Sequence, residues 1–425
     1  MNQFKVTGGR PLRGRITVPG DKSISHRALL LGALAEGTSV IRGLSTGTDV
    51  AATATAVAAL GAEVDRRGTT GAAITGGRGR LHQPAGTVEV GNSGTTLRLM
   101  AGMGAAFAWD TTFDGDQSIR RRPMDRVAAP LRLMGAGIDG ERAPLTVRGG
   151  GLHGIDYTLP VASAQVKGAV LLAGLGAEGE TVVRESVATR AHTEEMLAAC
   201  GAEVEVSDHR LVTRLRPGKL EPFELRVPGD PSQAAYWVVA ACIVPGSEVV
   251  VERVYVGQAR AAFVDVLRRM GADVELDMLD ATTADIWARA GWLHGTTVGG
   301  DEVPGLIDEI PVLAVAAAMA EGPTTFADAG DLAVKETDRI AAVTAELSAL
   351  GVVVEARPDG LVVAGGRGLR GAPVSSHGDH RMAMSLAVAA LAGEGTADID
   401  GWAAVATSYP DFVTDLERLC RAADR

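Results

Sequence analysis

Short polar segments that combine cations, hydroxyls and carboxylates recur along this chain, each just before a stretch expected to be helical. A helix start already carries unpaired N–H groups and positive dipole charge, so lysine or arginine placed there opposes stability. The same position suits anions, and clustered cations suit a ligand with several negative charges. The segments therefore predict a polyanionic ligand. They are 21–27, 91–98, 163–167, 229–233, 308–311 and 378–381 before one set of helices, and 120–124, 189–194 and 335–339 before a second set.

A short sequence that occurs twice indicates whether the fold needs these charges. Val-Pro-Gly-Asp occurs twice, followed first by Lys22 and later by Pro231 at the matching place. In the same alignment Tyr236 stands where the first copy has Arg27. Since the second copy lacks both cations, we expect that the fold does not need them and that they serve a ligand.

Residues four apart share one face of a helix. This spacing pairs Ser23 with Arg27, and we expect Lys335 and Arg339 to lie on one helix face in the same way. Clustered cations of this kind favour a phosphate or carboxylate ligand.

One supersecondary pattern is repeated six times and positions these segments. An alanine-rich helix runs into a strand, and a second helix ends on a Gly-Ala-x-Val type of sequence. Glycine suits the left-handed cap that ends a helix, and the β-branched residue after it starts a strand. The period predicts an α/β fold of repeated βαβαββ-type units. The capping glycines are Gly61, Gly135, Gly201, Gly271 and Gly351.

The two copies of Val-Pro-Gly-Asp predict the domain boundaries, because Pro-Gly breaks a strand before a helix opens. At 425 residues the chain is long enough for two or three domains. We expect one lobe at 21–226 with three repeats. The second lobe is expected to combine 1–20 with 227–425, and its N-terminal strand completes a repeat split by the termini. Hinges are expected near 19–21 and 227–230.

Bulk composition excludes several classes of protein. The net charge of −11 argues against a nucleic-acid partner. No apolar run suits a membrane span, and the first residues lack the apolar region of a signal peptide. Cys200, Cys242 and Cys420 lie far apart in sequence, as expected of buried thiols in a reducing compartment. We therefore expect a cytoplasmic protein.

Cofactor and metal motifs are weak in this sequence. The glycine-rich strings 76–79, 149–151 and 365–368 follow strands, so we interpret them as turns and not as dinucleotide loops, which must open a helix. His377 and His380 have no third ligand nearby in sequence. No cysteine or serine has a recognisable base partner. We expect no cofactor, no metal and no covalent catalysis.

As a set, the polar segments resemble the 5-enolpyruvylshikimate-3-phosphate synthases. The strings PGDKSISHR, GNSGTTLRL, RRPM, SAQVK, DEIP, VKETDR and GDHRMAM occur in the family order across nearly the whole chain. The resemblance implies an inside-out α/β barrel architecture of two lobes, each of three repeated units, with helix starts aimed at a cleft.

The resemblance also implies a reaction. The carboxyvinyl (enolpyruvyl) group of phosphoenolpyruvate is transferred to the 5-hydroxyl of shikimate 3-phosphate, and phosphate is released by addition and elimination. In this family Asp308 would accept the hydroxyl proton, while Lys22 and Glu336 would move protons to and from C3. The pathway is the shikimate pathway of aromatic amino-acid biosynthesis, and we expect a monomer with these small-molecule substrates.

The residues that would bind the two substrates are also carried over by resemblance. Those expected to bind shikimate 3-phosphate are Lys22, Ser23, Arg27, Ser163, Ala164, Gln165, Arg190, Asp308 and Lys335. Those expected to bind phosphoenolpyruvate are Lys22, Gly94, Arg122, Gln165, Arg339 and Arg381.

Three positions depart from other members of that family, and two alternatives stay open. Ala164 stands where some members have a second serine, His192 where some have tyrosine, and Thr407 where some have a lysine on phosphoenolpyruvate. Thr407 is therefore left out of the expected site. One alternative is a UDP-N-acetylglucosamine carboxyvinyltransferase, although residues 110–124 lack the cysteine typical of that loop. The other is a non-catalytic repeat protein that binds phosphorylated ligands.

Overall fold

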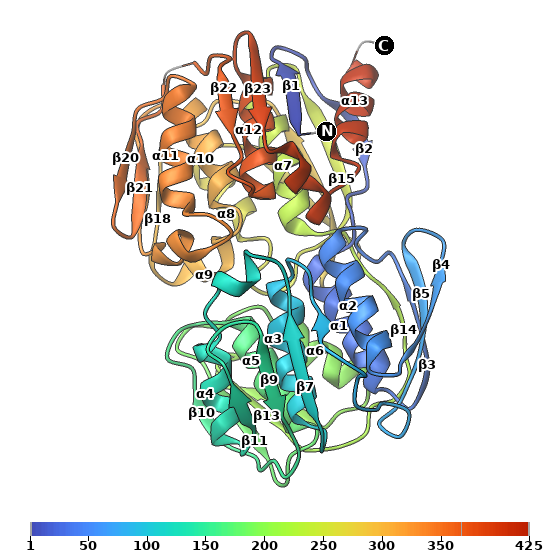
Figure 1. Cartoon of the computed structure of the whole chain (residues 1–425). Coiled ribbons are helices and arrows are strands. Elements are labelled where there is room, and N and C mark those ends of the chain that lie inside the picture. Colours follow the sequence, from blue (N-terminus) through green and yellow to red (C-terminus); the bar gives the residue numbers. More distant parts are fainter. Residues whose placement is uncertain (1, 367, 424–425) are drawn as a thin grey trace. The chain divides into compact units, whose positions relative to one another are not determined.

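The structure, a computed structural model, describes residues 2–366 and 368–423 (Figure 1). Its chain divides into two compact units. We call Gly20–Val227 the central unit, and Met1–Pro19 together with Pro228–Arg425 the terminal unit. Residue 367 of the expected turn at 365–368 lies outside the described residues, as do the ends at 1 and 424–425.

The central unit contains six α-helices among its described residues. They are α1 (Lys22–Leu34), α2 (Thr48–Ala59), α3 (Gly94–Ala105), α4 (Asp125–Leu133), α5 (Ala164–Gly174) and α6 (His192–Ala199). The strands are β3 (Gly37–Arg42), β4 (Glu63–Arg67), β5 (Gly71–Gly76), β6 (Val88–Glu89), β7 (Asp110–Asp114), β8 (Gly137–Asp139), β9 (Leu145–Arg148), β10 (Asp156–Thr158), β11 (Thr181–Arg184), β12 (Val204–Ser207), β13 (Val212–Leu215) and β14 (Glu224–Arg226).

The terminal unit repeats the same alternation of helices and strands. Its helices are α7 (Pro231–Ile243), α8 (Ala262–Arg269), α9 (Val303–Leu306), α10 (Ile310–Met319), α11 (Arg339–Ala349), α12 (His380–Ala392) and α13 (Phe412–Ala423). Its strands are β1 (Gln3–Thr7), β2 (Arg13–Ile16), β15 (Glu248–Tyr255), β16 (Asp273–Met278), β17 (Thr283–Arg289), β18 (Thr297–Val298), β19 (Thr324–Phe326), β20 (Val354–Arg357), β21 (Gly360–Val363), β22 (Pro373–Ser375) and β23 (Thr396–Asp400).

Each repeat contributes one small sheet with the same strand order. The central unit has β14-β3-β5-β4, β6-β7-β9-β8 and β10-β11-β13-β12. The terminal unit has β2-β15-β17-β16, β18-β19-β21-β20 and the shorter β22-β23-β1. In each four-stranded sheet the first pair is parallel and the other two pairs are antiparallel. The α/β fold of repeated units predicted from the sequence is confirmed.

The leading strands of two repeats are exchanged relative to the sequence order. β2 precedes α1 in the chain but pairs in parallel with β15, Arg13 lying opposite Glu248. β14 precedes α7 but pairs in parallel with β3, Glu224 lying opposite Val40. Of the N-terminal segment, only β1 completes the repeat formed at the C-terminal end, by pairing with β23. β2 therefore serves a different repeat from β1.

The glycine caps explain why the second helix of each repeat ends where it does. Gly61, Gly135, Gly201, Gly271 and Gly351 all have φ between +80° and +107°, a backbone conformation that glycine adopts without strain. The left-handed cap predicted from the Gly-Ala-x-Val endings is thus present at all five positions.

Small side chains let the first helices of the repeats pack closely. A Cβ at position 102 of α3 would lie 2.1 Å from the carbonyl oxygen of Ala169 in α5, so only glycine allows this crossing. In the terminal unit α7, α10 and α12 pack against one another, and Figure 1 shows the sheets of that unit arranged around them. The core helices therefore lie inside and the sheets outside. No helix in residues 2–366 or 368–423 combines the length and apolar character required to cross a membrane.

Candidate active site

The polar segments begin the helices as expected, and side-chain caps hold most of the first turns. In the central unit Asp21 accepts from the Ile24 N–H at 2.8 Å, and Ser93 accepts from the Thr96 N–H at 3.2 Å. Ser163 caps α5 in the same way. These caps place the first-turn side chains of α1, α3 and α5 at the starts of three packed helices.

The cations on α1 have protein partners that their spacing did not reveal. Lys22 Nζ donates to Asp49 Oδ2 at 3.0 Å, from a side chain 18% exposed to one 11% exposed. Arg27 is buried and donates from Nε to Thr193 Oγ1 at 2.7 Å and from a terminal nitrogen to the Ser23 carbonyl at 3.1 Å. Asp49 therefore offsets part of the positive charge at this helix start. Nothing in the sequence around Asp49 marks it as the partner of Lys22.

Gln165 is held in one orientation by two neighbours. Its amide oxygen accepts from Arg98 at 2.7 Å, and its amide nitrogen donates to Thr95 Oγ1 at 2.9 Å. Gly94 lies at the same place, since a Cβ there would be 2.9 Å from a terminal nitrogen of Arg122 and 3.0 Å from one of Arg98. Gln165, Gly94 and Arg122 are thus brought together. Arg98 was missed although it ends the segment 91–98.

Arg190 lies, half-buried, in the loop that leads into α6. A buried ionic triad anchors this loop to α5. Lys167 Nζ contacts Glu185 at 2.7 Å and Glu194 at 2.8 Å, with all three side chains at most 2% exposed. Thr189 also donates to Glu185. The lysine of the SAQVK string therefore pairs with two buried carboxylates, and these ion pairs account for its position without a ligand.

In the terminal unit, a carboxylate lies between two buried guanidinium groups. Arg339, 1% exposed, contacts Asp379 at 2.7 Å, Glu336 at 2.7 Å and Asp308 at 3.4 Å. Arg381 donates to the Asp308 carbonyl at 3.2 Å and lies 3.6 Å from its carboxylate. Asp308 itself remains 17% exposed. The structure thus gathers the predicted residues of this unit around one carboxylate.

The electrostatics of this cluster differ between its cations. Burial lowers the pKa of both Arg339 and Arg381, but the facing carboxylates outweigh it, chiefly Asp379 for the first and Asp308 for the second, so both pKa values are raised. For Lys335 burial dominates, and its pKa is lowered even though Asp308 acts in the opposite direction. Lys335 therefore holds its proton less firmly than an ordinary lysine.

One expectation about these segments is wrong. Lys335 and Arg339 do not share a helix face, because a 3-10 turn ends at Val334 and α11 begins only at Arg339. Asp338 caps that helix, so Lys335 lies outside it in an extended conformation.

Residues 120–124 lie directly before α4 as expected, with Met124 as its N-cap residue. That helix begins at Asp125, and Arg120 is paired with Asp114 at 2.6 Å.

One histidine that the sequence marked as a weak metal candidate lies beside a carboxylate. His377 Nε2 lies 2.7 Å from Glu346 Oε1. Among the described residues there is no cluster of three or more histidine, cysteine or acidic side chains that could hold a metal ion.

Arg260 is a buried arginine near the start of α7 that the sequence did not point to. It donates to Asp230 at 2.9 Å and to Ser232 at 3.3 Å, and Ser232 in turn donates to Glu309. This network joins the start of α7 to the start of α10, which follows Asp308. An isolated arginine in a loop carries no sequence signal for such a role.

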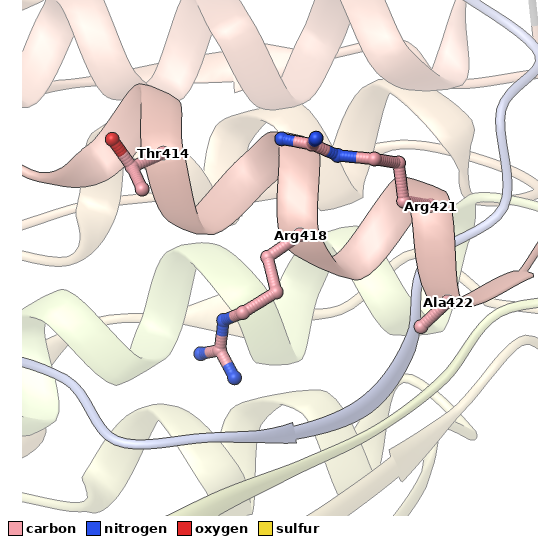
Figure 2. Close-up of a pocket in the computed structure, with 4 residues that line it drawn as sticks. All are labelled: Thr414, Arg418, Arg421 and Ala422. Carbon is pink, nitrogen blue, oxygen red and sulfur yellow. The ribbon is translucent and has the colours of Figure 1, made fainter.

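A cavity of about 510 Å³ beside α13 lies apart from these residues (Figure 2). It is lined by Thr414, Arg418, Arg421 and Ala422. Arg418 donates to the Arg15 carbonyl at 3.1 Å and Arg421 to Glu417 at 2.9 Å. The two guanidinium groups point in different directions in Figure 2, so they do not converge on an anion.

Six repeats in two units, with cations and carboxylates at the helix starts, define the two-unit α/β architecture of an enolpyruvyl transferase. The family model for EPSP synthase (3-phosphoshikimate 1-carboxyvinyltransferase) matches residues 6–416. The chain belongs to the EPSP synthase family.

Individual relatives agree with this assignment. The chain is 50% identical over 426 residues to the 3-phosphoshikimate 1-carboxyvinyltransferase of Gloeobacter violaceus (strain ATCC 29082 / PCC 7421), covering 98% of both chains. It is also 50% identical to the enzyme of that name from Synechococcus sp. (strain JA-3-3Ab), covering 97% of this chain and 96% of the relative. Its structure is similar to EPSP synthase from Acinetobacter baumannii, with a TM-score of 0.88 and 40% identity over 99% of this chain and 98% of the other.

Proposed function

We propose that this protein is a 3-phosphoshikimate 1-carboxyvinyltransferase. It transfers the enolpyruvyl group of phosphoenolpyruvate to the 5-hydroxyl of shikimate 3-phosphate and releases phosphate, in aromatic amino-acid biosynthesis. The family match over residues 6–416 supports the activity. The observation that carries the chemistry is Asp308, a partly exposed carboxylate held between the buried guanidinium groups of Arg339 and Arg381.

Shikimate 3-phosphate is assigned to cations and hydroxyls at the helix starts. In the central unit, Lys22, Ser23 and Arg27 from α1 would bind it together with Arg190 and the start of α5 at Ser163, Ala164 and Gln165. Buried or half-buried cations recognise phosphate strongly because their charge is weakly screened. Asp308 and Lys335 would contribute from the terminal unit.

Phosphoenolpyruvate is assigned to a second set of residues. Gly94 presents the first N–H of α3, and a ligand carboxylate or phosphate at that helix start is favoured by the dipole. Arg122 lies beside Gly94, and Gln165 donates to the hydroxyl of the next residue, Thr95. Lys22, Arg339 and Arg381 complete the set. Phosphoenolpyruvate carries a phosphate ester and a carboxylate, and these residues together offer cations and hydrogen-bond donors for both groups.

The reaction would proceed by addition and elimination. Asp308 accepts the proton of the 5-hydroxyl as that oxygen attacks C2 of phosphoenolpyruvate, and C3 takes a proton from Lys22 or Glu336. The tetrahedral adduct then loses phosphate and one C3 proton to regenerate the double bond. Arg339 fixes Glu336 at 2.7 Å. The cations stabilise the charge on the adduct and on the departing phosphate, which is usually the larger contribution to catalysis.

A phosphate-release assay separates this proposal from its alternatives. Purified protein is incubated with phosphoenolpyruvate and either shikimate 3-phosphate or UDP-N-acetylglucosamine. We expect phosphate only with shikimate 3-phosphate. Release with the nucleotide sugar would favour the related transferase, and no release with either acceptor would favour a non-catalytic binding protein.

The buried thiols offer little support for the nucleotide-sugar alternative. Burial raises the pKa of Cys200 and of Cys242 to about 12, which disfavours a reactive thiolate. Neither lies in the loop at 110–124.

We further infer that the protein acts in the cytoplasm as a monomer without a nucleic-acid partner, and that the connections near 19–21 and 227–230 serve as hinges. The net charge of −11 supports the absence of nucleic acid. The boundaries at Pro19 and Val227 support the two connections. Light scattering of the purified protein would test the monomer, and a dimer mass would contradict it.

A further inference from the structure

A chain of side-chain hydrogen bonds joins three helices in the interior of the central unit. His26 of α1 lies 2.6 Å from the Thr53 hydroxyl of α2, measured from Nδ1. The Thr53 and Thr96 hydroxyls are 2.6 Å apart, and Thr96 lies 2.7 Å from the hydroxyl of Ser93 at the start of α3. All four residues have 0% exposure.

The direction of these hydrogen bonds follows from one assigned donor. Thr96 donates its hydroxyl proton to Ser93, so its oxygen must accept from Thr53. Thr53 has then used its own proton and must accept from His26. The imidazole is therefore protonated on Nδ1. Its Nε2 is buried and has no hydrogen-bond partner among the described residues.

The charged groups around His26 leave this direction unchanged near neutral pH. Burial is the largest effect on the imidazole and lowers its pKa from 6.5 to about 3. Lys22 and Arg27 act in the same direction, while Asp49 and Asp21 oppose them. A neutral imidazole has one donor and one acceptor. Each group in the series therefore donates to the next, from His26 on α1 to Ser93 at the start of α3.

Both ends of this chain lie beside residues assigned to the substrates. His26 directly precedes Arg27 and is one turn after Lys22 on α1. Ser93 and Thr96 enclose Gly94 and Thr95 in the first turn of α3, and Thr95 accepts from Gln165 at 2.9 Å. Ser93 accepts from both the backbone N–H and the hydroxyl of Thr96, which closes that turn.

We propose that His26, Thr53, Thr96 and Ser93 form a positioning relay that fixes the first turn of α3 against α1 for phosphoenolpyruvate binding. This inference rests on the proposed function. With Thr96 donating to Ser93, the hydroxyls and Nδ1 of His26 can pair in only one arrangement, so the relay holds the Gly94 N–H in place before the ligand arrives. Preorganised donors bind a charged ligand without a reorganisation cost. The relay residues do not touch the substrate themselves.

The kinetic test uses three substitutions of buried threonines. Thr53→Val replaces the central hydroxyl with a methyl group of similar size, while Thr53→Ser keeps the hydroxyl. Thr213→Val is the matched control, because Thr213 is buried in the same unit and its hydroxyl has no hydrogen-bond partner among the described residues.

We expect Thr53→Val to raise the KM for phosphoenolpyruvate about ten-fold, equivalent to about 1.4 kcal/mol. Its KM for shikimate 3-phosphate and its kcat should change less than about two-fold by the same conversion. Thr53→Ser and Thr213→Val should stay close to the unsubstituted protein. An unchanged KM for phosphoenolpyruvate in Thr53→Val, or an equal rise with Thr213→Val, would overturn the relay. If the unsubstituted protein forms no product, the proposed function fails instead.

A spectroscopic test does not depend on enzymatic activity. Nitrogen-15 NMR of the unliganded protein distinguishes the two neutral imidazole tautomers by their ring-nitrogen shifts, and the His26 signal is assigned by its loss in His26→Asn. We expect the Nδ1-protonated tautomer, with no titration between about pH 8 and about pH 5, as its depressed pKa requires. An Nε2-protonated ring, or titration near the usual value of about 6.5, would refute the relay.

Discussion

His26 should make the stability of the central unit depend on pH below neutrality. Burial, the largest effect, lowers its pKa from 6.5 to about 3. In the unfolded chain the same imidazole binds a proton as the pH falls through about 6.5, whereas the folded state remains neutral until about pH 3. The unfolded state therefore binds more protons in this window. Stability is present at neutral pH and is lost progressively as the pH falls from about 6.5 towards about 3.

The size of the loss follows from this pKa difference. At about pH 5.5 an unfolded histidine is about nine-tenths protonated and the folded one is neutral, so the free energy of unfolding falls by about 1.4 kcal/mol relative to about pH 7.5. His26→Asn removes the titrating group but keeps an amide N–H that can donate to Thr53. We expect the variant to lose about 1.4 kcal/mol less than the unsubstituted protein over the same interval.

The assay must report on the central unit separately, because two units can unfold in two steps. Urea unfolding at the two pH values, followed by pulsed hydrogen exchange and mass spectrometry of peptides from α1, α2 and α3, gives that separation. His82→Asn, which removes an exposed histidine outside the relay, is the control for the loss of a histidine as such. Parallel pH dependence in His26→Asn and the unsubstituted protein would show that the imidazole is not held neutral.

Four further substitutions test the assigned roles. Lys22→Ala should lower kcat/KM by a factor corresponding to about 2–5 kcal/mol, with little change in melting temperature. Arg27→Ala should lower both kcat/KM and the melting temperature, because the buried hydrogen bond to Thr193 is lost as well. Full activity in either variant would contradict the assignment. Gly94→Ala places a methyl group 2.9 Å from a terminal nitrogen of Arg122. Because both residues are assigned to phosphoenolpyruvate, the variant should raise the KM for phosphoenolpyruvate more than the KM for shikimate 3-phosphate, and an equal change in both would count against that placement. Arg260→Met removes the cation that contacts buried Asp230 at 2.9 Å and lies 4.0 Å from Glu309, and chemical denaturation should show a loss of about 3–5 kcal/mol in the free energy of unfolding; a loss below about 1 kcal/mol, the range of an exposed ion pair, would not fit.

Local features of this protein were readable from the sequence because they depend on neighbouring residues alone. Gly61 and its four counterparts adopt the left-handed cap that their position after a helix requires. Asp21 and Asp379 cap α1 and α12 through backbone N–H groups only two or three residues away. The family-specific strings, read in order, supplied the resemblance that the family match supports.

Pairings between distant residues were not readable in this way. Asp49 pairs with Lys22, and Asp379 with Arg339, because α1 packs on α2 and α11 on α12. Each carboxylate is one of many in the chain, and nothing in its own surroundings marks it as the partner. Arg260 shows the same limit, since its partners at Asp230 and Ser232 lie about thirty residues earlier.

By itself, the amino-acid sequence determined the repeat, the helix starts and the chemical types gathered there, since these follow from periodicity and local backbone preference. The tertiary structure alone decided the exchange of β2 and β14, because parallel pairing uses main-chain hydrogen bonds that carry no side-chain signature. It also decided which carboxylates face which cations, and the direction of the relay from His26 to Ser93. Charge pairing and hydrogen-bond direction depend on distances between helices, and only their packing sets those distances.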